Sequence, residues 1–204
     1  NLNADAHWRG HCVSIAGRPS TVQWTLDASA LWHSVKQGLL LLNRTLDVMW
    51  YGGDVPLQNV AKELRRVGLG VMGWADVVQH RVQCPFTSPE AFGMLHRIGA
   101  VYTAAAHDVA FQSNITTTCV QPTGGITLLT RNRGFSVEPY FEDAGNMSVQ
   151  DHLRCVQAWL PYVDNCISKT VNLAHDSTLE DVLHTFQRAR AMRIPVVSVY
   201  RHGS

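Results

Sequence analysis

The segment from Ile167 to Tyr200, ISKTVNLAHDSTLEDVLHTFQRARAMRIPVVSVY, contains the pattern that decides the fold class. Its first seven residues are rich in β-branched side chains, as are residues 195–200 (PVVSVY), and both stretches predict strands. Between them, residues 177–180 (STLE) form a helix start, and the pattern that follows predicts a helix to about Met192. Two strands joined by a helix through short connections are parallel by default. The sequence therefore predicts an α/β fold.

Helices are also predicted upstream of this unit. Asp27 can cap a helix that runs to about Met49, and Gly52-Gly53 stops it. Pro56 then opens a second helix, which continues to about Arg65. One face of the first helix is predicted to be buried, because its apolar residues recur at helical spacing: Leu31, Val35, Leu39, Leu42, Leu46 and Met49.

A third helix and several strands follow from local signals. Residues 87–90 (TSPE) start a helix to about Phe111, in which Thr87 and Glu90 can form a capping box. Residues 148–151 (SVQD) start another, which Pro161 ends or kinks because proline lacks the N–H group. Three stretches have strand-like patterns: residues 12–15, 21–24 and 115–120.

The composition is that of a packed globular protein. The chain has 204 residues, of which 46% are hydrophobic and 16% charged, with a net charge of +1. It has no basic stripe or charge run, so we expect no nucleic-acid partner. The longest apolar run, Leu39–Leu42, is too short to span a bilayer, and no secretory signal is present, so we expect a cytoplasmic protein without a membrane partner. Because the first residue is Asn1, we expect the chain to start inside a longer polypeptide or after processing.

The cysteine pattern is not that of a disulfide framework or a zinc site. The number is odd and no C-x-x-C occurs, so we expect small buried apolar residues at all five positions: Cys12, Cys84, Cys119, Cys155 and Cys166. His7, His11 and Cys12 lie close together in the sequence, but no second cluster at ligand spacing follows, so no metal site is expected.

Residues 68–73 (GLGVMG) form a literal G-x-G-x-x-G. A dinucleotide-binding loop needs a strand directly before the first glycine, whereas residues 60–66 (VAKELRR) are good helix formers. A dinucleotide-binding fold also needs an acidic residue about twenty positions after the glycines. In this chain that residue is Glu90, which belongs to a helix start. We therefore expect these glycines to let a helix junction pack closely inside the protein, and not to bind a dinucleotide.

The same region resembles a family signature. Arg65–Asp76 (RRVGLGVMGWAD) is similar to the R-R-I-G-L-G-V-M-G-x-A-D pattern of the large catalytic subunits of ribonucleotide reductases, which lies on helix in that family. Four further segments resemble the family in the same order. Leu39–Asp47, followed by Pro56, resembles the family's helix before the signature. Residues 121–127 resemble the family's A-P-T-G-T-I-S loop, and residues 136–139 match the S-x-E-P that follows it. Residues 162–173 resemble the family's Y-V-D-N-A-I-S-K-T-I-N-L, and residues 197–204 resemble its G-V-T-V-Y-R-D-G-S. The resemblance covers nearly the whole chain from about Leu26.

The resemblance implies a specific architecture. The family has a ten-stranded α/β barrel built from two five-stranded parallel halves with helices outside, and residues 1–204 correspond to the C-terminal part of this catalytic domain. The family's radical cysteine lies in an Asn-x-Cys-x-Glu motif that this chain lacks. The motif is therefore expected in an N-terminal part outside the chain. No catalytic residue is assigned within residues 1–204, and none of the five cysteines is given a catalytic role.

The resemblance also implies an oxidoreductase that makes deoxyribonucleotides for DNA replication by thiyl-radical chemistry. Oxygen-dependent members use two adjacent tyrosines, whereas Tyr200 lies between Val199 and Arg201, as in adenosylcobalamin-dependent members. The implied cofactor is adenosylcobalamin. The implied partners are a ribonucleoside di- or triphosphate, the N-terminal part and a thioredoxin-like or dithiol reductant. The alternatives are a fragment of an oxygen-dependent large subunit and a non-catalytic phosphate-binding or structural remnant.

The clearest candidate site is the loop Pro122, Thr123, Gly124, Gly125 and Ile126. It follows a predicted strand, its glycines leave the backbone bare, and successive N–H groups at such a turn can bind phosphate oxygens. Thr123 adds a hydroxyl, as does Thr127 just after the loop. Composition alone would favour an ordinary turn, but the resemblance implies that this loop holds the substrate's phosphates. Gly125 replaces a threonine or serine of the family, and the connection before the loop is shorter than the family's.

Overall fold

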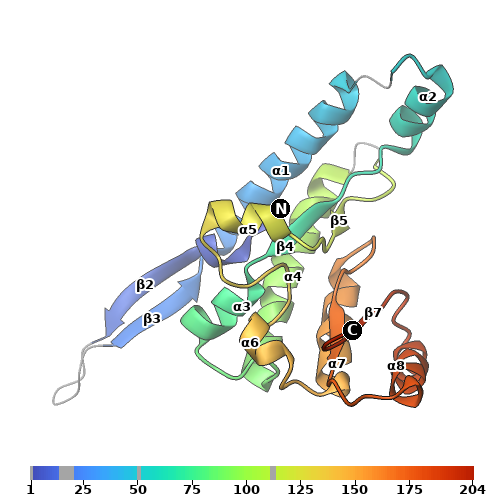
Figure 1. The fold of residues 1–204 in the computed structure, drawn as a ribbon. Helices are drawn as coiled ribbons and strands as arrows, with labels where there is room; N and C mark the ends of the chain where they lie inside the picture. The colour runs from blue at the N-terminus through green and yellow to red at the C-terminus, as the bar shows by residue number, and fades with distance from the viewer. Residues whose placement is uncertain (1, 14–20, 50–51, 111–113) are drawn as a thin grey trace.

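A computed structural model describes residues 2–13, 21–49, 52–110 and 114–204. Its strands make two small parallel sheets (Figure 1). One contains β1 (Leu2–Asn3), β4 (Leu69–Met72) and β5 (Thr118–Cys119) in that order. The other pairs β6 (Thr170–Leu173) with β7 (Ser198–Arg201). The predicted parallel pairing of the last two strands is confirmed.

A single parallel bridge between Val120 and Ile167 joins the two sheets. The pairings therefore run from β1 through β4, β5 and β6 to β7, all parallel and in chain order. This order is that expected for a five-stranded half-barrel. Apart from these sheets, the described residues form one antiparallel strand pair, and they close no ten-stranded barrel.

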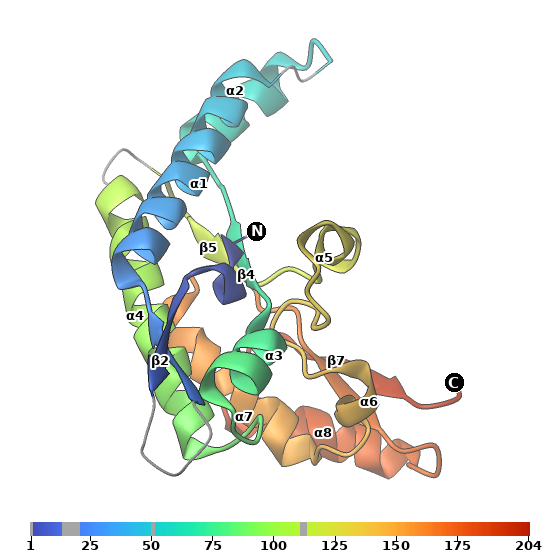
Figure 2. The ribbon, with the colours of Figure 1, turned by 90° about the vertical axis from the view of Figure 1, so that its left-hand side faces the viewer.

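Three long helices cover one face of the strands. They are α1 (Ala28–Val48), α4 (Pro89–Ala110) and α7 (Val149–Trp159). Figure 2 shows α1 and α4 on one side of β4 and the short helix α5 (Gly124–Thr130) on the other. The core between helices and strands is apolar, and Trp74 and Trp159 meet in it edge to face, with ring centroids 6.0 Å apart.

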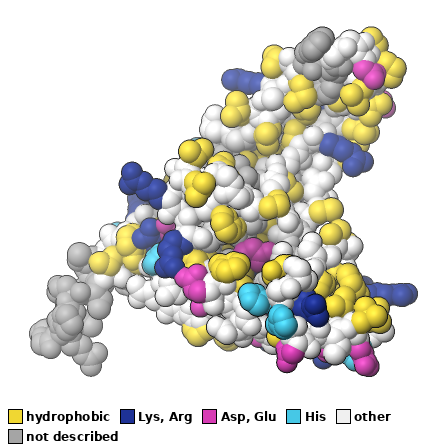
Figure 3. All heavy atoms as spheres, in the orientation of Figure 1, with side chains coloured by type: hydrophobic (Ala, Val, Ile, Leu, Met, Phe, Trp, Pro, Cys, Tyr) yellow, Lys and Arg dark blue, Asp and Glu magenta, His cyan; other side chains and the backbone are white. Residues whose placement is uncertain are grey.

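The predicted helix from Asp27 is confirmed, but only half of its apolar face is buried. The Asp27 side chain accepts a hydrogen bond from the Ala30 N–H group at 3.1 Å. Burial ends at Leu39, and Met49 is 43% exposed. The far end of α1 and the predicted second helix, α2 (Val55–Leu64), extend away from the sheets (Figure 1). Helix α2 buries no residue, and hydrophobic side chains gather on its surface (Figure 3).

The signature Arg65–Asp76 corrects one expectation. It was expected to lie on helix, but α2 ends at Leu64 and Leu69–Met72 form strand β4. The strand is buried because β1 and β5 flank it, so tertiary pairing decides its conformation. The predicted inward packing is confirmed for residues 69–73, which are buried, whereas Gly68 is half-buried. Gly73, at φ +77°, then starts α3 (Trp74–Asp76), which a π-helical turn, η2 (Val77–Val82), continues.

The first strand-like segments form an antiparallel hairpin of β2 (Trp8–Val13) and β3 (Thr21–Leu26), which projects from the molecule (Figure 1). Residues 14 and 15 of the first predicted stretch lie outside the described residues. The predicted strand 115–120 is shorter than expected, because only Thr118–Cys119 pair as a strand. A short 3-10 turn, η1 (Ala4–Ala6), precedes the hairpin.

The start of α4 differs from its prediction by one residue. The Ser88 hydroxyl, and not that of Thr87, accepts the hydrogen bond from the Ala91 N–H group at 3.2 Å. The predicted end at Phe111 lies outside the described residues. As Pro161 predicts, α7 gives way to the 3-10 turn η3 (Leu160–Tyr162).

The last helix, α8 (Leu179–Ala191), begins as its sequence predicts. The side chain of Thr178 and that of Asp181 form a reciprocal capping box at its start. One further short helix, α6 (Phe141–Ala144), lies between α5 and α7 in the chain.

Candidate functional site

Several loops follow the carboxyl ends of the parallel strands, where α/β proteins bind their ligands. Gly73 follows β4, and Pro122–Ile126 follow β5 and its bridge residue Val120. His175 and His202 follow β6 and β7. Because the strands are parallel, these segments share one edge of the sheets. The structure therefore places the predicted phosphate loop on the edge where a ligand site is expected.

The predicted loop leads directly into helix α5. The first backbone bond of this helix runs from the Thr127 N–H group to the Thr123 carbonyl oxygen at 3.2 Å. The N–H groups of Gly124, Gly125 and Ile126 precede that bond, so the helix offers them no acceptor. No side-chain hydrogen bond caps this helix within the described part of the chain. The loop thus ends in N–H groups that favour an anion.

Neither glycine of the loop is required by the fold. Gly124 and Gly125 are exposed, and a Cβ atom built on either would meet nothing within 4 Å. Neither has a positive φ. The absence of their side chains therefore leaves open space beside the free N–H groups.

Thr123 carries the unusual backbone of the loop instead. It adopts the left-handed conformation, with φ +56° and ψ +21°, which is rare for a β-branched residue. Its Oγ1 accepts a hydrogen bond from the Ser136 N–H group at 2.6 Å. The Thr127 hydroxyl donates to the Thr123 carbonyl oxygen at 2.6 Å. Both hydroxyls, which the sequence offered to a ligand, thus hold the loop in place from within.

Asp76, the last residue of the signature, holds the chain that returns from α5. Its carboxylate is buried and accepts hydrogen bonds from the N–H groups of Arg133 at 3.1 Å and Gly134 at 3.2 Å. It also accepts from the Asn132 side chain at 3.2 Å and the Tyr140 hydroxyl at 3.1 Å. Burial and the neighbouring Asp76 charge raise the pKa of Tyr140, which keeps its hydroxyl protonated as a donor. Asp76 therefore positions the segment packed against the phosphate loop.

A second buried polar cluster joins two other family motifs. The Lys169 Nζ atom is fully buried and donates to Glu138 Oε2 at 2.5 Å and to His152 Nδ1 at 2.8 Å. Glu138 Oε1 accepts from the Thr170 N–H group at 2.6 Å. Burial, and next the Lys169 charge, lower the pKa of His152 to about 4. The neutral imidazole can therefore accept from Lys169, and the cluster fixes the segment after α5 to the start of β6 and to α7.

Asp164 holds the segment before β6 against β5 through hydrogen bonds. Its carboxylate accepts from the Thr117 N–H group and hydroxyl at 2.8 and 2.9 Å, and from the Thr118 N–H group at 2.8 Å. Local sequence patterns could not predict these roles, since each pairing joins residues far apart in the chain. Only the resemblance marked Asp76, Glu138 and Asp164, and it did so without assigning them a function.

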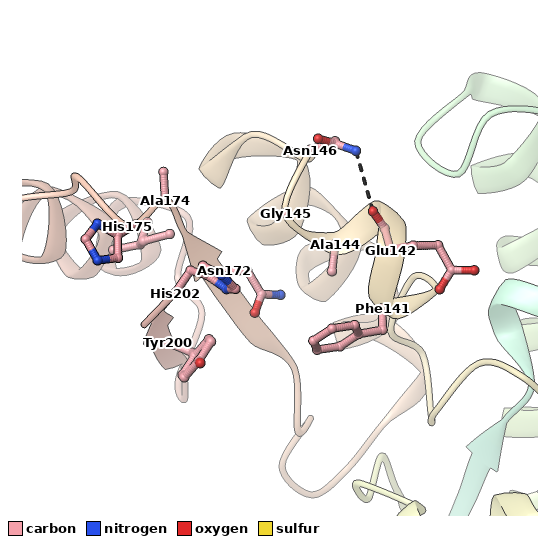
Figure 4. Close-up of a pocket in the computed structure, with 11 residues that line it drawn as sticks. Phe141, Glu142, Ala144, Gly145, Asn146, Asn172, Ala174, His175, Tyr200 and His202 are labelled. Atoms are coloured by element: carbon pink, nitrogen blue, oxygen red, sulfur yellow. Dashed lines mark hydrogen bonds between the residues drawn. The ribbon is translucent and has the colours of Figure 1, made fainter. Parts of the chain in front are cut away.

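A hollow of about 520 Å³ lies beside the carboxyl ends of β6 and β7 (Figure 4). Phe141 and Glu142 of α6 form one wall, and Tyr200 and His202 come from β7 and the residues after it. Pro122–Ile126 do not line it. The remaining residues around the hollow are Ala144, Gly145, Asn146, Asn172, Leu173, Ala174 and His175. The structure therefore does not bring the predicted loop and this hollow into one cavity.

The cysteines differ in their environments. Cys119 and Cys155 are buried, and burial raises their thiol pKa values to about 11 and about 12. Cys84 is half-buried. Cys166 is exposed, which contradicts its prediction as a buried residue. The side chain of Cys12 lies outside the described part.

No group of three or more potential metal ligands gathers among the described residues. None of the helices described has the length and apolar character needed to cross a membrane.

Comparison with known proteins places the chain near one group of enzymes. No protein-family model matches it. A vitamin B12-dependent ribonucleoside-diphosphate reductase of Mycobacterium tuberculosis is 25% identical, over 72% of this chain and 33% of the relative. The reductase of the same name from Thermoplasma acidophilum is 20% identical, over 72% of this chain and 30% of the relative. The chain thus spans about a third of the length of the curated relatives it matches.

The match with the M. tuberculosis reductase extends over 227 positions, more than the 204 residues of this chain, so the relative has residues within the matched region that this chain lacks. Among solved structures, the class Id ribonucleotide reductase alpha subunit of Actinobacillus ureae superposes with a TM-score of 0.71 at 14% identity. The superposition covers 91% of this chain and 50% of that one, and shows likeness of fold. The chain is therefore similar, at low identity, to vitamin B12-dependent ribonucleoside-diphosphate reductases, and it has an α/β fold similar to that of a ribonucleotide reductase alpha subunit.

Proposed function

We propose that this chain is the C-terminal part of a ribonucleotide reductase catalytic barrel, and that Pro122–Ile126 hold the phosphate groups of the ribonucleotide. The relatives are named as reductases of ribonucleotides, and the parallel strand order agrees with one half of such a barrel. The radical cysteine and the other half of the barrel then belong to an N-terminal part. A ribonucleoside di- or triphosphate and a dithiol or thioredoxin-like reductant complete the reaction.

One observation carries the site assignment. Helix α5 begins at the carboxyl edge of the strands with three N–H groups that have no acceptor in the helix. Hydrogen bonds from such groups to a charged phosphate are stronger than those between neutral partners. Asp76 and Thr123 hold the surrounding chain rigidly through buried hydrogen bonds, so the N–H groups are in place before a ligand arrives.

The names of the relatives support adenosylcobalamin as the cofactor, which would supply the radical. The hollow beside β6 and β7, about 520 Å³, is of the size that suits a small ligand. A corrin ring with its nucleotide tail is larger, and this hollow in the described residues does not enclose it. We therefore assign no residue of this chain to the cobalamin.

Turnover tests the proposal. The 204-residue chain alone, supplied with adenosylcobalamin and dithiol, is expected to form no deoxyribonucleotide, whereas the chain joined to its N-terminal part is expected to form it. In the joined protein, Gly124→Val should lower kcat/KM at least tenfold by covering the N–H groups. The control is Gly93→Val on α4, where a Cβ atom also meets nothing within 4 Å. Turnover by the chain alone, or equal losses in the two variants, would contradict the proposal.

A further inference from the structure

Two cysteines lie next to each other on neighbouring strands. Val120 and Ile167 pair in a parallel bridge, and the Val120 N–H group donates to the Cys166 carbonyl oxygen at 3.1 Å. Val120 and Ile167 are both buried in the apolar core. Because side chains alternate along a strand, the residues before them, Cys119 and Cys166, face the opposite side of the sheet. Cys119 and Cys166 are therefore adjacent positions on two paired segments.

The chain leaves room for a thiol at this place. Cys119 pairs with Gly70 of β4. A Cβ atom built on Gly68 would lie 2.6 Å from the Cys119 sulfur, so only glycine admits that sulfur there. Cys166 is exposed on the neighbouring segment, and both thiols are free.

The separation of the two residues suits a disulfide. Neighbouring strands lie about 4.7–4.9 Å apart, and disulfides join residues whose Cα atoms are about 4.4–6.8 Å apart. The Cys166 charge is also one of the causes that raise the pKa of Cys119, after burial and the Asp164 carboxylate. A thiolate at Cys166 would thus disfavour a thiolate at Cys119.

We propose that Cys119 and Cys166 form a redox-convertible dithiol that a low-molecular-weight disulfide oxidises to an intramolecular disulfide. The exposed Cys166 thiolate attacks the oxidant, forms a mixed disulfide and releases one reduced thiol. The Cys119 thiol then loses its proton to solvent and attacks the Cys166 sulfur, and the second reduced thiol leaves. Two protein thiols lose two hydrogen atoms, and the oxidant becomes two thiols. This inference does not depend on the proposed reductase function.

The buried thiol, Cys119, limits the rate of disulfide formation. Because the pKa of Cys119 is about 11, few Cys119 thiolates exist at neutral pH. The second step is therefore slow near pH 7 and accelerates as the pH rises toward that value. The closed disulfide would tie the end of β5 to the segment before β6, three residues before Pro122. Oxidation thus fixes the strand end that carries the phosphate loop.

Peptide mapping of the oxidised chain tests the inference. The reduced 204-residue chain is incubated with oxidised glutathione, its remaining thiols are alkylated, and tryptic peptides are analysed by mass spectrometry. Peptide 98–131 contains Cys119 as its only cysteine, whereas peptide 155–169 contains both Cys155 and Cys166. The Cys155→Ala variant therefore makes the assignment unambiguous. We expect peptides 98–131 and 155–169 to be joined, with a yield at least tenfold above any other pair.

Two variants separate the proposed pair from general thiol reactivity. Cys166→Ser is expected to abolish the joined peptides, and its exposed position makes the change safe for the fold. Cys84→Ser is expected to leave them unchanged. The rate of joining should rise with pH above neutrality. Glutathione that remains on Cys166 without progress to the joined peptides would overturn the inference, as would joining that involves Cys84 or Cys155.

Discussion

The hydroxyl of Thr123 shows how a residue of the predicted site acts on the fold instead of on a ligand. The Thr123→Val variant keeps the shape of the side chain but removes the oxygen that accepts a hydrogen bond from the buried Ser136 N–H group. We expect the free energy of unfolding to fall by about 1–3 kcal/mol. The Thr123→Ser variant keeps the hydroxyl, so its free energy of unfolding should fall much less. Urea unfolding measures both, and equal losses in the two variants would show that the hydrogen bond is not the cause.

His152 gives a prediction for pH. Its pKa is about 4 in the folded chain and about 6.5 when unfolded, so the unfolded state binds more protons between these values. Stability is therefore lost as the pH falls through this window, by roughly 1–3 kcal/mol between about pH 7 and about pH 5. The His152→Gln variant, whose side chain stays neutral, should lose less stability over this pH range. The exposed His33→Gln variant should show the same loss of stability as the parent chain. Identical pH dependence in all three proteins would contradict the assignment.

Residue roles were the least predictable part of the site. The sequence identified Pro122–Ile126 from turn chemistry. The left-handed backbone conformation of Thr123 could not be predicted from composition. The work of Asp76 and Lys169 depends on partners more than 15 residues away in the chain. Local patterns report on local structure, so such partners become visible only when the chain is folded.

At the scale of elements, helix starts were predictable because their signals are local. Asp27, Ser148 and Thr178 each cap the helix that follows, through hydrogen bonds to N–H groups within three residues. Strand β4 was not predictable, because a glycine within it and a helix before it are poor strand signals. It exists because β1 and β5 pair with it on both sides.

The close spacing of β4 and β5 can be tested through Gly68. A Cβ atom there would lie 2.6 Å from the Cys119 sulfur, so Gly68→Ala should destabilise the chain by about 1–3 kcal/mol. Cys119→Ala removes the sulfur, and the double variant should recover at least half of the loss. Thermal or urea unfolding of the four proteins completes the cycle. Additive losses would mean that the two residues do not meet.

At the scale of the whole molecule, the α/β class and the parallel pairing of the last two strands could be predicted, but the cavities could not. The last strand pair followed from β-branched runs around a well-capped helix. The hollow at β6 and β7 draws its walls from α6 and two strand ends, which only tertiary packing brings together (Figure 4). Closure of a ten-stranded barrel requires strands beyond those that the described residues supply.

The central claim is that the start of α5 binds phosphate, and amide NMR of the 204-residue chain tests it most directly. Pyrophosphate is titrated into the ¹⁵N-labelled chain, with Gly124→Val as the blocked variant and Gly93→Val as the control. The account predicts saturable shifts centred on the amides of Gly124, Gly125 and Ile126, retained in the control and lost in the blocked variant. Shifts centred elsewhere, or unmoved amides at these three residues, would contradict it.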